Sequence, residues 1–283
     1  MNEITIQNVT KSYGSVLALD DVSLSFSENH IYGLLGRNGA GKSTLLNLIT
    51  GRQFADSGNI RVDGQYAPEN PEAQRKIFMM SEKNLYPTSM KVAEAFRWTS
   101  RFYPEFDRDL SASLSSRFGL DPKKKIKSLS TGYASIFKLI TAVATRAPYI
   151  FLDEPVLGLD ANHRDLFYRS LIEQYSENPR TYIISTHLIE EAANVIDQVI
   201  IIKNGRLLKD ESRDDLLRQG YTISGPAASV DAYAAGRNIL GSDTLGGLKT
   251  AYLLGECDAS ALPSGIEISH LDLQHLFIQL TNA

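Results

Sequence analysis

The amino-acid sequence predicts an α/β fold built on a mainly parallel β-sheet. Short apolar runs at residues 31–35, 149–152, 182–184 and 199–202 have the length and composition of buried strands. Residues with helical spacing separate these runs, and residues 71–147 are mainly helical in pattern apart from a short apolar strand. Strands that alternate with helices form a parallel sheet that is covered on both faces.

The first 30 residues have a different pattern, which is typical of half-buried strands. Ile4 and Ile6, and later Val22, Leu24 and Phe26, alternate with polar residues. A period of two residues places every second side chain on one face of a strand. We therefore expect the chain to begin with strands that have one buried face.

Composition and charge exclude several classes of protein. The chain has 283 residues, of which 43% are hydrophobic and 22% charged, so we expect an ordinary buried core. Its net charge of −4 argues against a nucleic-acid partner, because such proteins usually carry a basic patch. Cys257 is the only cysteine, which excludes an intramolecular disulfide and fits a reducing compartment. Without a signal-peptide pattern or about 18 consecutive apolar residues, we expect a cytoplasmic chain with no membrane span.

A change in charge near residue 220 predicts two domains, 1–220 and 221–283. The second segment carries a net charge of −4, whereas the first is neutral overall. Its pattern indicates a small α/β accessory domain of ferredoxin-like type. The expected strands are 221–224, 238–240, 248–254 and 266–268, and the expected helices lie near 229–236 and 271–281.

Residues 36–43, Gly36-Arg37-Asn38-Gly39-Ala40-Gly41-Lys42-Ser43, have the pattern of a phosphate-binding loop, or Walker A motif, between a strand and a helix. The glycines let backbone amides turn onto phosphate oxygens, and the helix that follows adds its positive N-terminal end. We expect Lys42 to reach the β- and γ-phosphates, Ser43 to hold Mg²⁺, and Thr44 to bind the α-phosphate. The predicted ATP-binding residues of this loop are Gly36, Asn38, Gly39, Ala40, Gly41, Lys42, Ser43 and Thr44.

Two carboxylates directly follow the apolar strand at residues 149–152. Asp153 and Glu154 would lie at the carboxyl end of that strand, where open α/β sheets bind their ligands. One carboxylate suits the Mg²⁺ shell, and the next can orient or deprotonate the attacking water. We predict Asp153 as a metal ligand and Glu154 as the general base. The alternative is a pair of solvated surface acids, which is unusual after so apolar a strand.

The phosphate loop and the two carboxylates belong to a wider pattern. Residues 1–215 resemble the nucleotide-binding subunit of an ATP-binding-cassette (ABC) transporter. The segment Leu129-Ser130-Thr131-Gly132-Tyr133 resembles the family signature, usually Leu-Ser-Gly-Gly-Gln. The segment Gly158-Leu159-Asp160 resembles the loop that communicates across the dimer. His187 stands at the position of the family's switch histidine, and Tyr13 at that of an aromatic residue which stacks on adenine.

The resemblance implies a P-loop NTPase fold with an N-terminal antiparallel β-subdomain and a helical subdomain inserted at about residues 83–147. It implies an ATPase that powers transport through a separate transmembrane permease, which holds the chain at the inner face of the cell membrane. It also implies a homodimer, or a heterodimer with a related cassette, in which each ATP is sandwiched. Ser130, Thr131 and Gly132 would then contact the ATP of the partner. Asp160 would link the two sites, and Glu154 and His187 would act in catalysis.

Glu82 departs from the family pattern, which has a glutamine after this short strand. The segment 77–83 aligns Glu82 with that position, and we list it as a third candidate Mg²⁺ ligand. Its negative charge beside ATP would need an offset from the metal or from Lys83. We therefore predict a low basal ATPase rate that rises when the membrane partner is attached. The alternative is that Glu82 points to solvent.

Three questions stay open from the sequence. The aromatic residues between positions 91 and 106 either line a groove for the permease or form the core of the helical subdomain. Residues 273–281 resemble the terminal helix of bacterial drug, antibiotic and peptide exporter cassettes, which favours export. The alternative function is a soluble regulatory ABC ATPase that is not coupled to transport.

Overall fold

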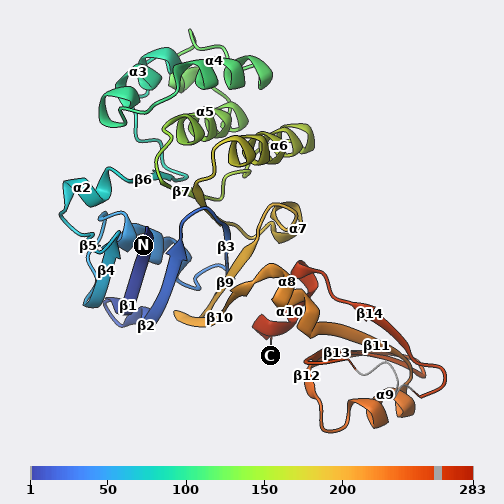
Figure 1. Cartoon of the computed structure of the whole chain (residues 1–283). Coiled ribbons are helices and arrows are strands. Elements are labelled where there is room, and N and C mark those ends of the chain that lie inside the picture. The colour runs from blue at the N-terminus through green and yellow to red at the C-terminus, as the bar shows by residue number, and fades with distance from the viewer. Residues whose placement is uncertain (1, 258–262, 283) are drawn as a thin grey trace.

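The computed structural model describes residues 2–257 and 263–282. Figure 1 shows a central sheet, a second sheet beside it near the N-terminus, a group of helices above both, and a third sheet with helices at the lower right, formed by the C-terminal residues. Within the described ranges, no helix combines the length and apolar character needed to cross a membrane.

The central sheet has six strands and carries the predicted parallel core. From β9 to β6 every neighbouring pair is parallel, and β10 adds an antiparallel edge strand beside β9. Successive side chains of one strand enter two different hydrophobic clusters, since Tyr149 and Phe151 pack on one face of the sheet and Ile150 and Leu152 on the other. In spatial order the strands are β10 (Arg206–Ser212), β9 (Gln198–Lys203), β3 (Ile31–Leu35), β8 (Thr181–Ser185), β7 (Tyr149–Asp153) and β6 (Ile77–Met80).

A second sheet contains the antiparallel strands expected at the N-terminus. Its two long strands pair from Glu3 opposite Ser27 to Tyr13 opposite Val16. Their inward side chains cover the helix that follows the phosphate loop, and together they form one hydrophobic cluster. The strands are β2 (Val16–Ser27), β1 (Glu3–Tyr13), β4 (Ser57–Val62) and β5 (Gln65–Tyr66), and the helix is α1 (Lys42–Ile49).

The helices above the sheets are held together by an aromatic core. The ring of Phe96 lies 6.0 Å from that of Phe106 and 5.7 Å from that of Phe137, centre to centre. These rings therefore belong to the subdomain core. The elements in this part are α3 (Val92–Phe102), α4 (Arg108–Arg117), η1 (Ile126–Ser128), α5 (Thr131–Ala144) and α6 (Ala161–Glu177). Two short helices lie elsewhere (Figure 1): α2 (Pro71–Gln74) is beside β4, and α7 (Ile189–Ala192) contacts α10 beside the central sheet.

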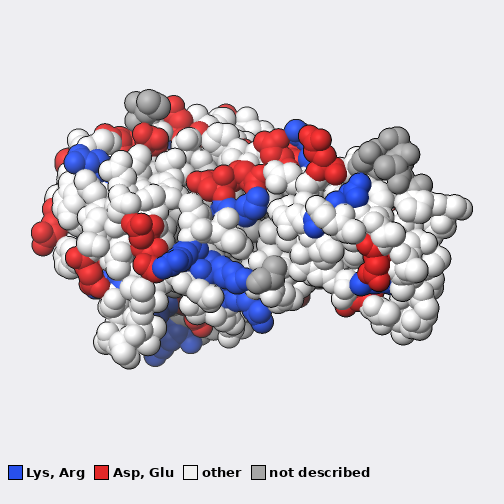
Figure 2. Space-filling model, turned by 90° about the horizontal axis from the view of Figure 1, so that it is seen from below, with Lys and Arg blue, Asp and Glu red and all other residues white. Residues whose placement is uncertain are grey.

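The C-terminal residues form an antiparallel sheet with the strand order β12-β13-β11-β14. The predicted strands and both predicted helices are present, and a small cluster around Tyr221, Ile223 and Leu253 forms a local core. On the face seen in Figure 2, charged side chains gather on the larger part of the molecule, and the part at the right carries fewer of them. The elements are α8 (Arg213–Gln219), β11 (Gly220–Pro226), α9 (Ala227–Ala234), β12 (Asn238–Leu245), β13 (Leu248–Leu254), β14 (Glu267–His270) and α10 (Leu273–Asn282).

The last helix, α10, packs back on the rest of the protein. Leu273, Leu276 and Leu280 are buried in the large cluster that also contains β7, α5 and α6. The fit is close, because a Cβ atom at Gly220 would lie 2.9 Å from a methyl carbon of Leu276. The C-terminal residues thus share an apolar core with the rest of the chain.

We predict that Leu276→Ala lowers the free energy of unfolding by about 2–5 kcal/mol, because it opens a cavity at a fully buried side chain. Chemical denaturation followed by circular dichroism measures the change. Leu245→Ala is the matched control, since Leu245 is exposed, and should stay within about 0.5 kcal/mol of the parent. Equal effects of the two substitutions would show that α10 is not part of the core.

Candidate nucleotide-binding site

The phosphate loop joins β3 to α1, and its three glycines are explained by the geometry. Gly39 and Gly41 have φ angles of +80° and +110°, which side chains disfavour. Gly41 also has no room for a side chain, because a Cβ atom there would lie 2.6 Å from the carbonyl oxygen of Ala18. At Gly36 the same atom would lie 2.6 Å from the carbonyl oxygen of Ile202. The loop can therefore follow this path only with glycine at these three positions.

Lys42 begins α1 and folds back across the loop. Its side chain is almost buried, and Nζ donates to the carbonyl oxygen of Gly36 at 2.6 Å and to that of Arg37 at 3.4 Å. Burial lowers the pKa of Lys42, and the carboxylates of Glu154 and Asp153 act in the opposite direction. A bound phosphate would supply the counter-charge that this ammonium lacks in the loop.

Ser43 and Asp153 lie together although they are far apart in sequence. The Ser43 hydroxyl donates to Oδ2 of Asp153 at 3.3 Å. Burial raises the pKa of the Asp153 carboxyl, and the Glu154 charge raises it further, while the Ser43 hydrogen bond and Lys42 oppose that change.

This pair fits the requirements of Mg²⁺. The ion prefers hard oxygen ligands and is usually bound by one or two carboxylates, several waters and the substrate phosphates. A hydroxyl and a carboxylate side by side supply such a partial shell. Among the described residues no group of three or more His, Cys, Asp or Glu side chains forms a complete metal cage.

Glu154 follows β7 and is held in an unusual conformation. Its φ angle is +49°, in the left-handed region, and its amide donates to the carbonyl oxygen of Ser185 at 2.8 Å. The carboxylate accepts a hydrogen bond from the Thr186 hydroxyl at 3.2 Å and lies 2.9 Å from Nδ1 of His187. Backbone and side chain of Glu154 are therefore both fixed by the end of β8.

One cavity of about 440 Å³ brings most of the predicted residues together. It is open to solvent at the edge of the sheet, and Glu82 faces it from the loop after β6. His187 reaches it only through Glu154. The lining residues are Val16, Leu17, Ala18, Asn38, Gly39, Ala40, Gly41, Lys42, Ser43, Thr44, Glu82, Asp153 and Glu154.

Tyr13 is not among the lining residues. Its hydroxyl donates to Oε1 of Gln53, and Nζ of Lys11 lies 5.7 Å from its ring centre. Val16 and Leu17, which the sequence reasoning missed, line the cavity instead and are exposed apolar residues at the start of β2. Their signal in the sequence is an apolar pair directly after the turn that follows Tyr13.

The signature residues lie outside this cavity. Ser130 caps α5 and accepts a hydrogen bond from the Tyr133 amide at 3.3 Å. Gly132 must be small, since a Cβ atom there would lie 3.0 Å from the carbonyl oxygen of Gly158. Thr131, which replaces the usual glycine, starts the helix with its side chain beside Gly158.

Asp160 caps the next helix, α6. Its carboxylate accepts from the His163 amide at 2.9 Å and lies 2.8 Å from the ring nitrogen Nδ1 of the same residue. These hydrogen bonds hold the pKa of the Asp160 carboxyl below its usual range. Within one chain, the signature therefore contacts the loop that ends at Asp160. Neither of them lines the cavity at the phosphate loop.

The comparisons with known proteins agree with this geometry. A family model described as "ABC transporter" matches residues 19–157. The chain is 30% identical over 220 residues to the ABC transporter ATP-binding protein YtrB of Bacillus subtilis (strain 168), covering 78% of this chain and 75% of that protein. It is 30% identical to the sulfate/thiosulfate import ATP-binding protein CysA of Ralstonia nicotianae, covering 98% and 76%. The arabinose import ATP-binding protein AraG of Rhizobium meliloti is 32% identical, but the chain spans only 42% of its length.

Solved structures support the same fold. A structure described as the ATP binding subunit of an ABC transporter superposes with a TM-score of 0.69 at 24% identity, covering 76% of this chain and 92% of the other. A dimeric post-hydrolysis cassette, MJ0796 bound to ADP and Pi, gives a TM-score of 0.66 at 23% identity, with 74% and 98% covered. The fold and the family that the sequence predicted are both confirmed. The chain belongs to the ABC transporter family and is one of its ATP-binding cassettes, an ATPase.

Proposed function

We propose that this chain is the ATP-hydrolysing subunit of an ABC transporter and powers a separate membrane permease through ATP-driven pairing of two cassettes. The observation that carries the proposal is the cavity in which Lys42, Ser43, Asp153 and Glu154 converge. It offers a phosphate site, metal ligands and a base within one opening.

The separation of the signature from this cavity supports pairing. Ser130 and Gly132 stand at the N-terminal end of α5, an end that favours anions, yet neither lines the cavity of its own chain. A second cassette, identical or related, would bring such an end to the ATP. Nucleotide that binds the paired state better than the open one shifts the population toward pairing, and hydrolysis removes that preference.

Within the cavity we assign the roles as follows. Lys42 and the loop amides hold the phosphates, and Ser43 and Asp153 hold Mg²⁺, with Glu82 as a further candidate ligand. Mg²⁺, when bound, neutralises charge on the transferred phosphate. Glu154 orients the attacking water and accepts its proton, and the contact of 2.9 Å with His187 holds the carboxylate for that task.

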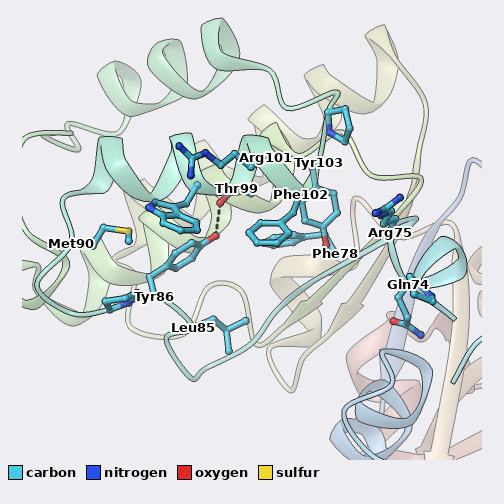
Figure 3. Close-up of a pocket in the computed structure, with 14 residues that line it drawn as sticks. Gln74, Arg75, Phe78, Leu85, Tyr86, Met90, Thr99, Arg101, Phe102 and Tyr103 are labelled. Atoms are coloured by element: carbon cyan, nitrogen blue, oxygen red, sulfur yellow. Dashed lines mark hydrogen bonds between the residues drawn. The ribbon is translucent and has the colours of Figure 1, made fainter. Parts of the chain in front are cut away.

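A second opening is the proposed contact for the permease. It has a volume of about 760 Å³ and lies between α3, α2 and the loop after β6. Figure 3 shows Leu85, Tyr86 and Phe102 around the same space, with the Tyr86 hydroxyl 2.7 Å from that of Thr99. Phe102 is 64% exposed and Trp98 47% exposed. Such an apolar groove fits a short helix of a partner protein.

This groove bears on a question that the sequence left open. Phe96 and Phe106 belong to the core of the helical subdomain, whereas Trp98, Phe102 and Tyr103 line the groove. Some of the aromatic residues between positions 91 and 106 therefore fit the core interpretation, and others line the groove proposed for the permease. Placement at the inner face of the membrane would follow from docking at this groove, and a soluble regulatory ATPase without a permease is the alternative function.

The direction and cargo of transport stay predictions. Export of a drug, antibiotic or peptide rests on the resemblance of the last helix alone. Two of the relatives named above, CysA and AraG, are import proteins by name, which gives no support to export.

We also propose residues 221–283 as an accessory domain that acts on the ATPase domain of residues 1–220. The last turn of α10 lies against the phosphate loop, where Nη1 of Arg37 donates to Oδ1 of Asn282 at 3.2 Å. Thr281 shares a small cavity with Asn38 and Gly39. If this contact regulates the loop, the Leu276→Ala variant should bind ATP more weakly at temperatures where it remains folded.

We predict that Glu154→Gln lowers the rate of ATP hydrolysis about 10²–10⁴-fold, because the amide cannot accept the proton of the attacking water. Phosphate release measures the rate, and size-exclusion chromatography with Mg²⁺ and ATP should show a stable cassette pair. Glu190→Gln, an exposed acid on α7, is the control and should turn over like the parent. Undiminished turnover of Glu154→Gln would remove Glu154 as the base.

We predict that Trp98→Ala combined with Phe102→Ala abolishes association with the permease and leaves the ATPase activity of the isolated chain within about twofold of the parent. An affinity-tagged chain recovered from detergent-solubilised membranes, analysed by mass spectrometry for a polytopic protein, provides the measurement. Ile239→Ala removes an exposed apolar side chain from β12 and serves as the control. Recovery of no membrane protein by the parent chain would favour the soluble regulatory alternative.

A further inference from the structure

The nucleotide cavity carries an unusual excess of negative charge. Three carboxylates, Glu82, Asp153 and Glu154, line it, and Lys42 is the one cation among its described lining residues. ATP adds further negative charge, and like charges in a partly buried site repel one another strongly. A cassette with glutamate at position 82 therefore needs a compensating cation nearby.

Lys138 on α5 is a cation that contacts the loop of Glu82. Its Nζ donates to the carbonyl oxygen of Glu82 at 2.8 Å and to that of Ser81 at 3.0 Å. The side chain is half-buried, and burial lowers the pKa of Lys138 while the charge of Glu82 raises it. The ammonium thus binds the backbone of the same residue, Glu82, that lines the cavity.

A second cation, Arg52, also holds the loop. Arg52, which follows α1, donates to the Ser81 hydroxyl at 3.3 Å and to the carbonyl oxygen of Met79 at 3.4 Å. Two cations, one from the nucleotide-binding core and one from the helical subdomain, therefore fix the segment that carries Glu82. Lys83, which the sequence offered as the offset, is exposed and does not line the cavity.

We propose that Lys138 is a positioning residue for ATP binding: held at the backbone carbonyl of Glu82, its ammonium offsets the charge that Glu82 adds beside Mg²⁺ and ATP. The inference rests on the proposed function, since it requires Mg²⁺ and ATP in the cavity. It predicts that Lys138 matters only as long as position 82 carries a charge. A residue that merely packed α5 would matter equally with glutamine there.

The test is a double-mutant cycle on the full chain with Lys138→Met, Glu82→Gln and both together. All are made in the Glu154→Gln background so that ATP is not consumed, and calorimetry measures ATP affinity in Mg²⁺. Lys138→Met should weaken binding about tenfold when Glu82 is present and less than about twofold when Glu82→Gln is also present. Lys138→Arg should keep most of the affinity, because it keeps the charge.

Lys83→Met is the matched control, since it removes an adjacent but exposed cation, and its affinity should equal that of the parent. Thermal unfolding of each variant establishes that it is folded. Equal losses from Lys138→Met with and without Glu82→Gln, or no loss at all, would overturn the role of Lys138 and leave the proposed function intact. If the parent chain bound no ATP, the proposed function itself would fail.

Discussion

The parallel register of β3, β8 and β7 is the constraint on which the nucleotide site depends. Leu34 in β3 pairs with Ser185 in β8, and Ser185 pairs with Asp153 in β7. Because parallel strands end at the same edge of a sheet, the phosphate loop, the Asp153–Glu154 pair and His187 all open at that edge. The hydrogen bond of 2.8 Å from the Glu154 amide to Ser185 extends this register one residue beyond β7.

Two energetically unfavourable features lie at this edge of the sheet. A left-handed backbone at Glu154 costs on the order of 1 kcal/mol, and a nearly buried ammonium at Lys42 loses hydration. Both persist because the surroundings fix them: Ser185, Thr186 and His187 hold Glu154, and loop carbonyls hold Lys42. A bound phosphate would offset the lost hydration of the Lys42 ammonium, and this gain would favour phosphate binding at the loop.

The sequence predicts features that depend on residues close together along the chain, and it misses those that depend on distant segments. The parallel strands, the phosphate loop and the carboxylates after β7 are local patterns, and the register then brings them together. The polar edge strand β10 and the short strands β4 and β5 have weak local signals and were not predicted. Contacts between distant segments were also missed, as with Lys138 and Glu82, which are 56 residues apart. Their pairing depends on how α5 lies against the loop after β6, and no periodicity encodes that.

The helix α5 carries two residues with different proposed roles, Ser130 at its start and Lys138 further along. Ser130 at its N-terminal end does not line the cavity of its own chain, and Lys138 two turns later holds the loop that lines this cavity. The two positions are about 12 Å apart along the helix. The helix is held as one packed element, since its apolar face is buried along the segment from Ile136 to Ala144. In the proposed pair, the contact of Ser130 with the partner's nucleotide and the hold of Lys138 on the loop of Glu82 would therefore be linked through one helix.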